Sequence, residues 1–328
     1  NRRSRGLGDV YKRQKLYLHE IDFSMSILIK SAKIIDASSK FNGKTKDIFI
    51  KQGIIQEIDD KIVKKSAKEI ILDNLHISQG WLDSSVSFGE PGLEERETIE
   101  NGSLTACLSG FTDIILNSNT LPVIDSKADV IYVKSKNKNK ALKIHPLGAL
   151  TVKSEGSEMA ELHEMFDSGA VGFYDYKTSV KNPNLLKTAL QYVQHFDGLI
   201  MTFPFEKSIC QNGQMNEGEI SALYGLEGIP SLSEEITLER DLKILEYTGG
   251  KLFIPTISTT KSVELIKKAK RKGLQIMTSV SINNIFFNEE KLINFDTRFK
   301  ILPPLRSEED RLILVNALSE GIIDCLLY

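Results

Sequence analysis

Histidines are the residues of this chain best suited to metal binding or proton transfer, and their spacing favours neither. The chain has five, and each stands alone: His19, His76, His145, His163 and His195. None follows the His-x-His or His-Glu-x-x-His spacing that places two imidazoles on one metal ion. A lone histidine usually belongs to the core or the surface, so the residues themselves predict no histidine-based site.

The three cysteines give no site either. Cys107, Cys210 and Cys325 are widely separated, which excludes the short spacing of zinc knots. An odd number of cysteines in a long chain is also not a disulfide scaffold. This usage fits a reducing compartment, and we expect a cytoplasmic protein.

Composition describes an ordinary globular chain, with 41% hydrophobic residues, 26% charged residues and a net charge of −2. The near-neutral charge gives no reason to expect a nucleic-acid partner. No apolar run is long enough to cross a bilayer, so we expect no membrane span. At 328 residues, the chain can hold one large domain and a smaller module.

The two ends of the chain carry separate expectations. Residues 1–24 are expected to be a non-native or disordered tail, because residues 1–14 (NRRSRGLGDVYKRQ) are basic and lack the apolar stretch of a secretory signal. Met25 is the expected natural start, and a native disordered tail is the alternative. Residues 321–328 (GIIDCLLY) resemble a strand that stops without a turn, so we expect a domain incomplete at its C-terminus.

Two kinds of pattern divide the rest. Residues 25–78 contain short strand-like runs, at 27–35 and 47–58, which predict a small β module. From residue 79 to 328, apolar strands alternate with amphipathic helical windows. Strands are expected at 80–88, 112–117, 142–151, 170–174, 199–203, 251–258, 274–280 and 323–328. Helices are expected at 94–109, 158–168, 182–194, 232–247, 260–273 and 307–319.

This alternation predicts an α/β fold with a (β/α)8 TIM-type barrel. A doubly wound open sheet is the competitor, but no Gly-x-Gly-x-x-Gly follows an early strand. In such a barrel, the C-terminal ends of the strands form the functional site. Residues at those ends are therefore the candidates to examine.

Several segments at these positions resemble the dihydroorotases, which are cyclic amide hydrolases of the amidohydrolase superfamily. The segments follow the family order from about residue 26 to 328: Gly80-Trp81-Leu82-Asp83, Glu90-Pro91-Gly92, Asn117-Ser118-Asn119-Thr120, Gly172-Phe173-Tyr174-Asp175, Gly225-Leu226-Glu227-Gly228 and Pro303-Pro304-Leu305-Arg306. The resemblance implies the superfamily barrel. It also implies that the N-terminal module is the first part of a β-sandwich.

The resemblance further implies where zinc and substrate would bind, and the residues there differ. The family has a His-x-His pair that binds zinc after the first strand and an arginine that binds the substrate carboxylate. Ser85, Ser87 and Gly89 stand in those three places. Asn119 matches the family's substrate-binding asparagine. Asp175 matches a carboxylate that contacts the metal, and it is the one retained catalytic candidate.

The other positions that the resemblance assigns to the site also carry different side chains. The remaining histidines correspond to Phe203 or Pro204, to Phe253 and Thr256, and to Asn283 with Asn284, while Leu302 replaces an asparagine. Hydroxyl, amide and apolar side chains are poor zinc ligands. We therefore expect no metal ligand set and no cofactor, although the resemblance implies zinc in active family members.

Two functions follow from this interpretation. The first is a non-catalytic dihydroorotase-like subunit of pyrimidine biosynthesis, a pseudoenzyme that forms a homo-oligomer and supports a partner. The resemblance implies aspartate transcarbamoylase as that partner. The second is an active dihydroorotase, or a related cyclic amide hydrolase, that converts carbamoyl aspartate to dihydroorotate at an unorthodox site.

A third, weaker hypothesis is a vestigial pocket that binds a small molecule without turnover. Its lining would come from small polar residues at the strand ends: Ser85, Ser87, Asn119, Asp175, Thr256 and Asn283. Replacing histidines by smaller groups removes the need for metal and leaves space for a ligand.

Overall fold

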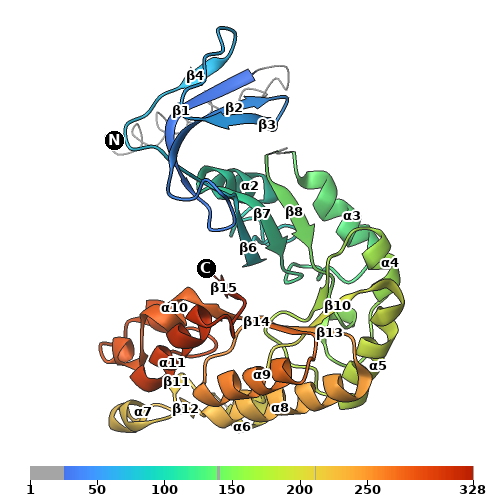
Figure 1. Ribbon diagram of the computed structural model, residues 1–328. Coiled ribbons are helices and arrows are strands. Elements are labelled where there is room, and N and C mark those ends of the chain that lie inside the picture. Colours follow the sequence, from blue (N-terminus) through green and yellow to red (C-terminus); the bar gives the residue numbers. More distant parts are fainter. Residues whose placement is uncertain (1–25, 139–140, 211, 328) are drawn as a thin grey trace, which may run out of the picture. The chain divides into compact units, whose positions relative to one another are not determined.

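The computed structural model describes residues 26–138, 141–210 and 212–327. The predicted tail over residues 1–24 lies outside the described residues. The chain divides into two compact units, one ending at Gly80 and the other beginning at Trp81. Figure 1 shows the elements of both units, and each unit is described by itself.

The first unit is a single five-stranded sheet. Its strands are β1 (Ser26–Ile35), β2 (Thr45–Lys51), β3 (Ile54–Asp59), β4 (Lys68–Ile70) and β5 (His76–Ser78). Strand β1 pairs antiparallel with β2 and parallel with β4 and β5, and β2 pairs antiparallel with β3. The expected run at 47–58 is therefore two strands that turn at Gly53. Because residues 26–80 form one sheet, a β-sandwich here stays a prediction.

A buried carboxylate holds this sheet to the segment that follows it. Asp47 is 2% exposed and accepts hydrogen bonds from the backbone N–H groups of Ser31 and Ile62, both at 2.9 Å. The Lys30 ammonium also donates to it. Hydrogen bonds from a neighbouring cation and two backbone groups stabilise a carboxylate away from water.

The second unit has the eight expected strands in the expected order. They are β6 (Trp81–Val86), β7 (Phe111–Leu116), β8 (Lys143–Pro146), β9 (Phe173–Tyr174), β10 (Leu199–Met201), β13 (Lys251–Ile254), β14 (Ile276–Ser281) and β15 (Cys325–Leu327). All of their pairings are parallel. They form two ladders, β6–β7–β8 and β9–β10–β13–β14–β15.

Contacts at both ends of these ladders fit a closed barrel. A parallel bridge between Gly148 and Phe173 connects the end of β8 to β9. At the other edge, Ser84 Oγ in β6 lies 3.8 Å from Cys325 Sγ in β15. The second unit is therefore the predicted (β/α)8 barrel.

Helices connect the strands and lie outside them (Figure 1). The main ones are α2 (Ile99–Leu108), α3 (Lys127–Lys136), α4 (Leu162–Asp167), α5 (Pro183–Val193), α8 (Ser231–Thr248), α9 (Thr260–Arg271) and α11 (Glu308–Ser319). Helix α2 begins later than expected because Thr98 caps it, accepting a hydrogen bond from Asn101 N at 3.2 Å. Helix α3 was not expected, although its capping box of Ser126 and Asp129 is a recognisable start signal.

Shorter elements lie in the segments that connect the barrel strands, most of them after β10 and β14. They are α6 (Lys207–Cys210), β11 (Met215–Asn216), α7 (Glu219–Tyr224), β12 (Gly228–Ile229), α10 (Ile282–Phe286), and the 3-10 helices η1 (Val152–Ser154), η2 (Gln194–Phe196), η3 (Glu289–Leu292) and η4 (Thr297–Phe299). Within the described residues, no helix is long and apolar enough to cross a membrane.

Alternation along the strands separates an outer core from the barrel interior. In β7, Ile114 and Leu116 belong to the large cluster between strands and helices. Ile115 points the other way and packs on a second cluster. Asp113 and Asn117, two residues before and after Ile115, share its side of the strand.

Candidate functional site

Three of the predicted site residues meet at the ends of β6 and β7. Asn117 Nδ2 donates to Ser85 Oγ at 3.1 Å and to Ser87 Oγ at 3.0 Å. Ser87 Oγ in turn donates to Asn119 Oδ1 at 3.0 Å. These four side chains form a continuous network of neutral hydrogen-bonding groups, which we call the serine–asparagine network.

Asn117 is the member of this network that sequence reasoning did not single out. It is 1% exposed, and its Oδ1 has no hydrogen-bond partner among the described residues. The available signal was its position two residues before Asn119 and directly after a strand, where alternation turns it into the barrel. Its side-chain amide fixes the positions of the Ser85 and Ser87 hydroxyls by donating a hydrogen bond to each.

Asp175, the retained catalytic candidate, is almost fully buried and already engaged. Its Oδ1 accepts hydrogen bonds from the backbone N–H groups of Leu150 at 2.9 Å and Thr151 at 3.0 Å. Its Oδ2 accepts from Thr151 Oγ1 at 2.5 Å. Burial raises the pKa of Asp175 above its ordinary value, and the hydrogen bonds from Thr151 and Leu150 act in the opposite direction. The carboxylate thus anchors the loop after β8.

Apolar side chains occupy the barrel interior next to these residues. Phe203 and Phe253 are 2% and 7% exposed and pack in one cluster with Leu147, Tyr174 and Met201. Leu302 packs against the same cluster. Three positions that the resemblance assigns to polar site residues are therefore part of a hydrophobic core.

Thr256 and Asn283 are not joined to the serine–asparagine network by any hydrogen bond among the described residues. Thr256 Oγ1 donates to the carbonyl of Pro255 at 2.6 Å. Asn283 lies in α10, where its backbone N–H donates to Ser281 Oγ at 3.2 Å. Asn284, beside it, is buried and donates to the carbonyl of Pro304 at 2.9 Å.

Gly89 occupies the position of the family arginine in a backbone conformation that favours glycine. Its φ is +146°, and a Cβ built there would come 2.4 Å from the carbonyl oxygen of Leu93. A side chain of any length at this position would need a different backbone.

These donors do not fit a zinc ion. Zinc in proteins is held by thiolate, imidazole and carboxylate groups. The mouth of the barrel offers hydroxyls, amides and phenyl rings, and the buried Asp175 carboxylate there is used by N–H and O–H donors. Across the described ranges, no group of three or more His, Cys, Asp or Glu is placed to hold a metal ion.

One segment of the resemblance ends in Arg306, which is 3% exposed and lies at the centre of a buried polar network. Its guanidinium donates to Ser258 Oγ at 3.1 Å, to Asn216 Oδ1 at 2.8 Å and to the carbonyl of Ile229 at 2.7 Å. Glu234 accepts from Ser258 N at 2.8 Å and lies in the same network. Burial lowers the pKa of Arg306, and Glu234 acts in the opposite direction. We call this the Arg306 network.

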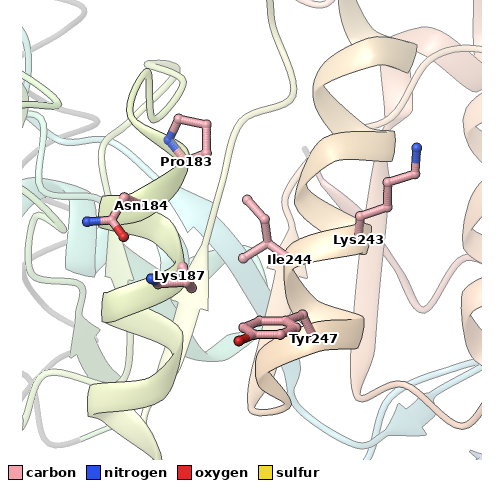
Figure 2. Close-up of a pocket in the computed structure, with 6 residues that line it drawn as sticks. All are labelled: Pro183, Asn184, Lys187, Lys243, Ile244 and Tyr247. Carbon is pink, nitrogen blue, oxygen red and sulfur yellow. The ribbon is translucent and has the colours of Figure 1, made fainter.

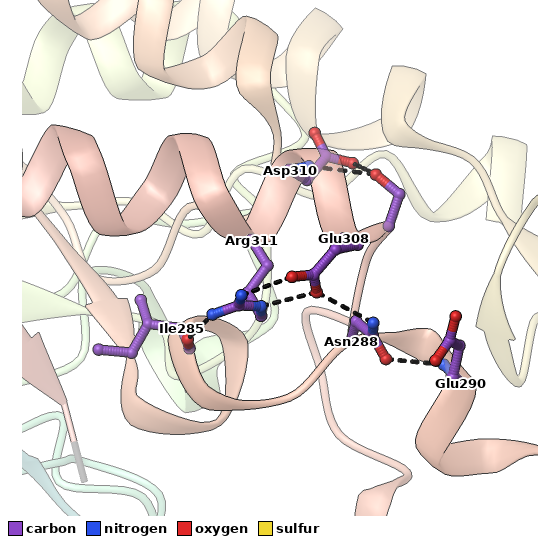
Figure 3. Close-up of polar contacts among 7 residues, drawn as sticks. Ile285, Asn288, Glu290, Glu308, Asp310 and Arg311 are labelled. Carbon is purple, nitrogen blue, oxygen red and sulfur yellow. Dashed lines mark hydrogen bonds and ion pairs between the residues drawn. The ribbon is translucent and has the colours of Figure 1, made fainter.

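A second set of polar contacts fixes α11 against α10 and η3 (Figure 3). Arg311 donates to Glu308 at 2.7 Å and to the carbonyl of Ile285 at 2.9 Å. Asn288 Nδ2 donates to Glu308 Oε2 at 3.0 Å. Helix α10, which carries Asn283, is thus fixed against helix α11.

A pocket of about 270 Å³ also lies on the outer face, between α5 and α8 (Figure 2). Its lining combines lysines with apolar groups: Pro183, Asn184, Lys187, Lys243, Ile244 and Tyr247. All of these residues come from the outer helices, so the pocket is separate from the strand-end site.

Comparison with known proteins identifies the family. Residues 76–262 match the dihydro-orotase-like family model. The dihydroorotase of Caldanaerobacter subterraneus subsp. tengcongensis is 36% identical over 304 residues, which is 92% of this chain and 70% of that protein. This chain belongs to the dihydroorotase-like family. The dihydroorotase of Aquifex aeolicus is 34% identical over 302 residues, 92% of this chain and 71% of that protein.

Solved structures confirm the fold of this dihydroorotase-like chain. The L-hydantoinase (dihydropyrimidinase) of Arthrobacter aurescens aligns with a TM-score of 0.76 at 20% identity, over 92% of this chain and 68% of that one. A D-hydantoinase (dihydropyrimidinase) from Thermus sp. aligns with a TM-score of 0.71 at 18% identity and the same coverage. Both the predicted family and the predicted amidohydrolase barrel are therefore confirmed.

Proposed function

We propose that this dihydroorotase-like chain is a non-catalytic subunit of pyrimidine biosynthesis. In this proposal, it works in the cytoplasm as a homo-oligomer and supports aspartate transcarbamoylase. The observation that carries the proposal is the apolar cluster inside the barrel. The resemblance expects imidazoles at Phe203 or Pro204 and at Phe253. Both phenylalanines are packed in this cluster with Leu147, Tyr174 and Met201.

The chemistry of ring opening supports the same proposal. Hydrolysis of a cyclic amide at neutral pH needs an activated water, and a metal ion lowers the pKa of a bound water to about 7. The serine–asparagine network offers neutral groups, which neither hold such an ion nor act as strong bases. Both Asp175 oxygens are already occupied by hydrogen bonds from Leu150 and Thr151, and these would have to be exchanged before the carboxylate could act on a water.

An active dihydroorotase is the second candidate, and the names of the relatives favour it. Two of them carry that name at 36% and 34% identity over most of this chain. Under this candidate, Asp175 would be the base and Asn119 would contact the substrate. A rearrangement that frees the Asp175 carboxylate would be required.

Metal content and turnover separate the two candidates. We expect the native protein to contain well under one zinc per chain by plasma mass spectrometry. We also expect no conversion in either direction between carbamoyl aspartate and dihydroorotate with added zinc. The Aquifex aeolicus dihydroorotase, assayed in parallel, is the positive control. Stoichiometric zinc together with turnover would establish the second candidate and end the first.

Association and ligand binding are tested separately. Under the proposal, the protein co-elutes with aspartate transcarbamoylase of the same organism on a sizing column, and independent elution would contradict the partnership.

The serine–asparagine network is further proposed to bind a small molecule without turnover. A rise in melting temperature with carbamoyl aspartate or dihydroorotate that Asn117→Leu abolishes would support that binding, and no rise would oppose it.

A further inference from the structure

A second cavity lies inside the barrel, toward the N-terminal ends of the strands. Its volume is about 380 Å³. Strands β6, β7 and β8 and the segment before β9 supply its lining: Leu82, Asp113, Ile115, His145 and Val171. Asp113 and Asn117 face the barrel interior from opposite sides of Ile115, which packs on the apolar cluster. The cavity is thus distinct from the serine–asparagine network.

A histidine–aspartate pair provides the polar part of this cavity. His145 Nε2 lies 2.8 Å from Asp113 Oδ1, and the two side chains are 35% and 31% exposed. The hydrogen bond with His145 is the main cause that lowers the pKa of Asp113. The carboxylate is therefore ionised near neutral pH, and Nε2 carries the proton that it accepts. In a neutral His145 this places the proton on Nε2, and Nδ1 then has no hydrogen-bond partner among the described residues.

The remaining lining is apolar. Leu82 is 54% exposed and Val171 is 37% exposed, so both present hydrocarbon surface to solvent at the cavity. An apolar cavity of about 150 Å³ is enough to bind benzene, and binding pockets for small molecules begin at about 300 Å³. The space is therefore sufficient for a substituted ring.

We propose that this cavity is a binding site for a small uncharged molecule with an apolar ring and one hydroxyl group. The hydroxyl pairs with His145 Nδ1, and the ring is buried against Leu82, Ile115 and Val171. A hydroxyl suits this nitrogen in both protonation states, because it can donate to a neutral ring or accept from a protonated one. A carboxylate ligand is disfavoured by the ionised Asp113 beside the ring.

The test compares 4-methylphenol with toluene, which has the same ring and methyl group but no hydroxyl. Binding is followed by NMR titration of the full protein, read at the proton resonances of the two probes, so that wild type and every variant are measured in the same way. We expect saturable binding of 4-methylphenol, and we expect His145→Phe to weaken it about tenfold, the equivalent of one hydrogen bond. Toluene affinity should change little in this variant, because the apolar walls remain.

Two further variants keep the test decisive. His163→Phe is the matched control, since His163 also faces an aspartate, at 3.6 Å, but lies on the outer helix α4; it should leave both affinities unchanged. Val171→Phe fills the cavity and should weaken both probes, which locates binding even if His145→Phe folds poorly. The proposal fails if 4-methylphenol does not saturate, or if it binds wild type and His145→Phe equally.

Discussion

Replacing Arg306 by leucine is expected to lower the free energy of unfolding by about 3–5 kcal/mol. The side chain is 3% exposed and donates to Asn216, Ser258 and Ile229. Removing it leaves these acceptors unpaired, and it also removes the positive charge that offsets the nearby buried Glu234 carboxylate. Urea unfolding followed by circular dichroism measures the loss.

Arg298→Leu is the matched control for this substitution. Arg298 also pairs with a carboxylate, Asp296, at 2.6 Å, but its side chain is 84% exposed. Exposed ion pairs contribute about 0–1 kcal/mol, so this variant should unfold close to wild type. Equal effects of the two substitutions would mean that the Arg306 network does not hold the loops after β10, β13 and β14 together.

Replacing Asp175 by alanine is expected to destabilise the barrel by about 3–5 kcal/mol, because three buried donors lose their acceptor at about 1–3 kcal/mol each, partly offset by relaxation. The donors are Leu150 N, Thr151 N and Thr151 Oγ1. Asp175→Asn should cost less, since its amide oxygen still accepts from the two backbone groups. An unchanged melting temperature in Asp175→Ala would show instead that the carboxylate is free for chemistry.

The same residue gives a pH dependence with a defined sign. Burial raises the pKa of Asp175 in the folded chain above its value in the unfolded chain. The folded state therefore holds the proton more tightly, and this contribution to stability is fully present below the unfolded pKa of about 3.9. It is lost as pH rises through the folded pKa. The stability of wild type relative to Asp175→Asn should consequently fall as the pH rises above about 4.

The strands of this barrel could be predicted from sequence because each is a short apolar run between polar helical windows. Their lengths were harder to predict. The run at 142–151 suggested one long strand, but β8 ends at Pro146, and beyond the bridge between Gly148 and Phe173 the loop is held by Asp175. That partner is 24 or more residues away along the chain, and no local pattern signals it.

The site was predictable only where the resemblance supplied positions. Ser85, Ser87 and Asn119 were singled out and lie in one network, whereas Asn117, which joins them, was not. The pairing of His145 with Asp113 was also missed. It depends on the register between β7 and β8, which sets Ile115 opposite His145. A lone histidine carries no sign of such a partner.

The turn at Gly89 restricts how this chain could change over evolution. Because a Cβ at this position would lie 2.4 Å from the carbonyl of Leu93, Gly89→Arg meets a steric barrier before it gains any contact with a substrate. Histidines placed at Ser85 and Ser87 would still lack that arginine until residues 89–93 had been rebuilt. Under the proposed non-catalytic role, gaining the site that the resemblance implies would therefore need residues 89–93 to be rebuilt as well as the histidines to be introduced.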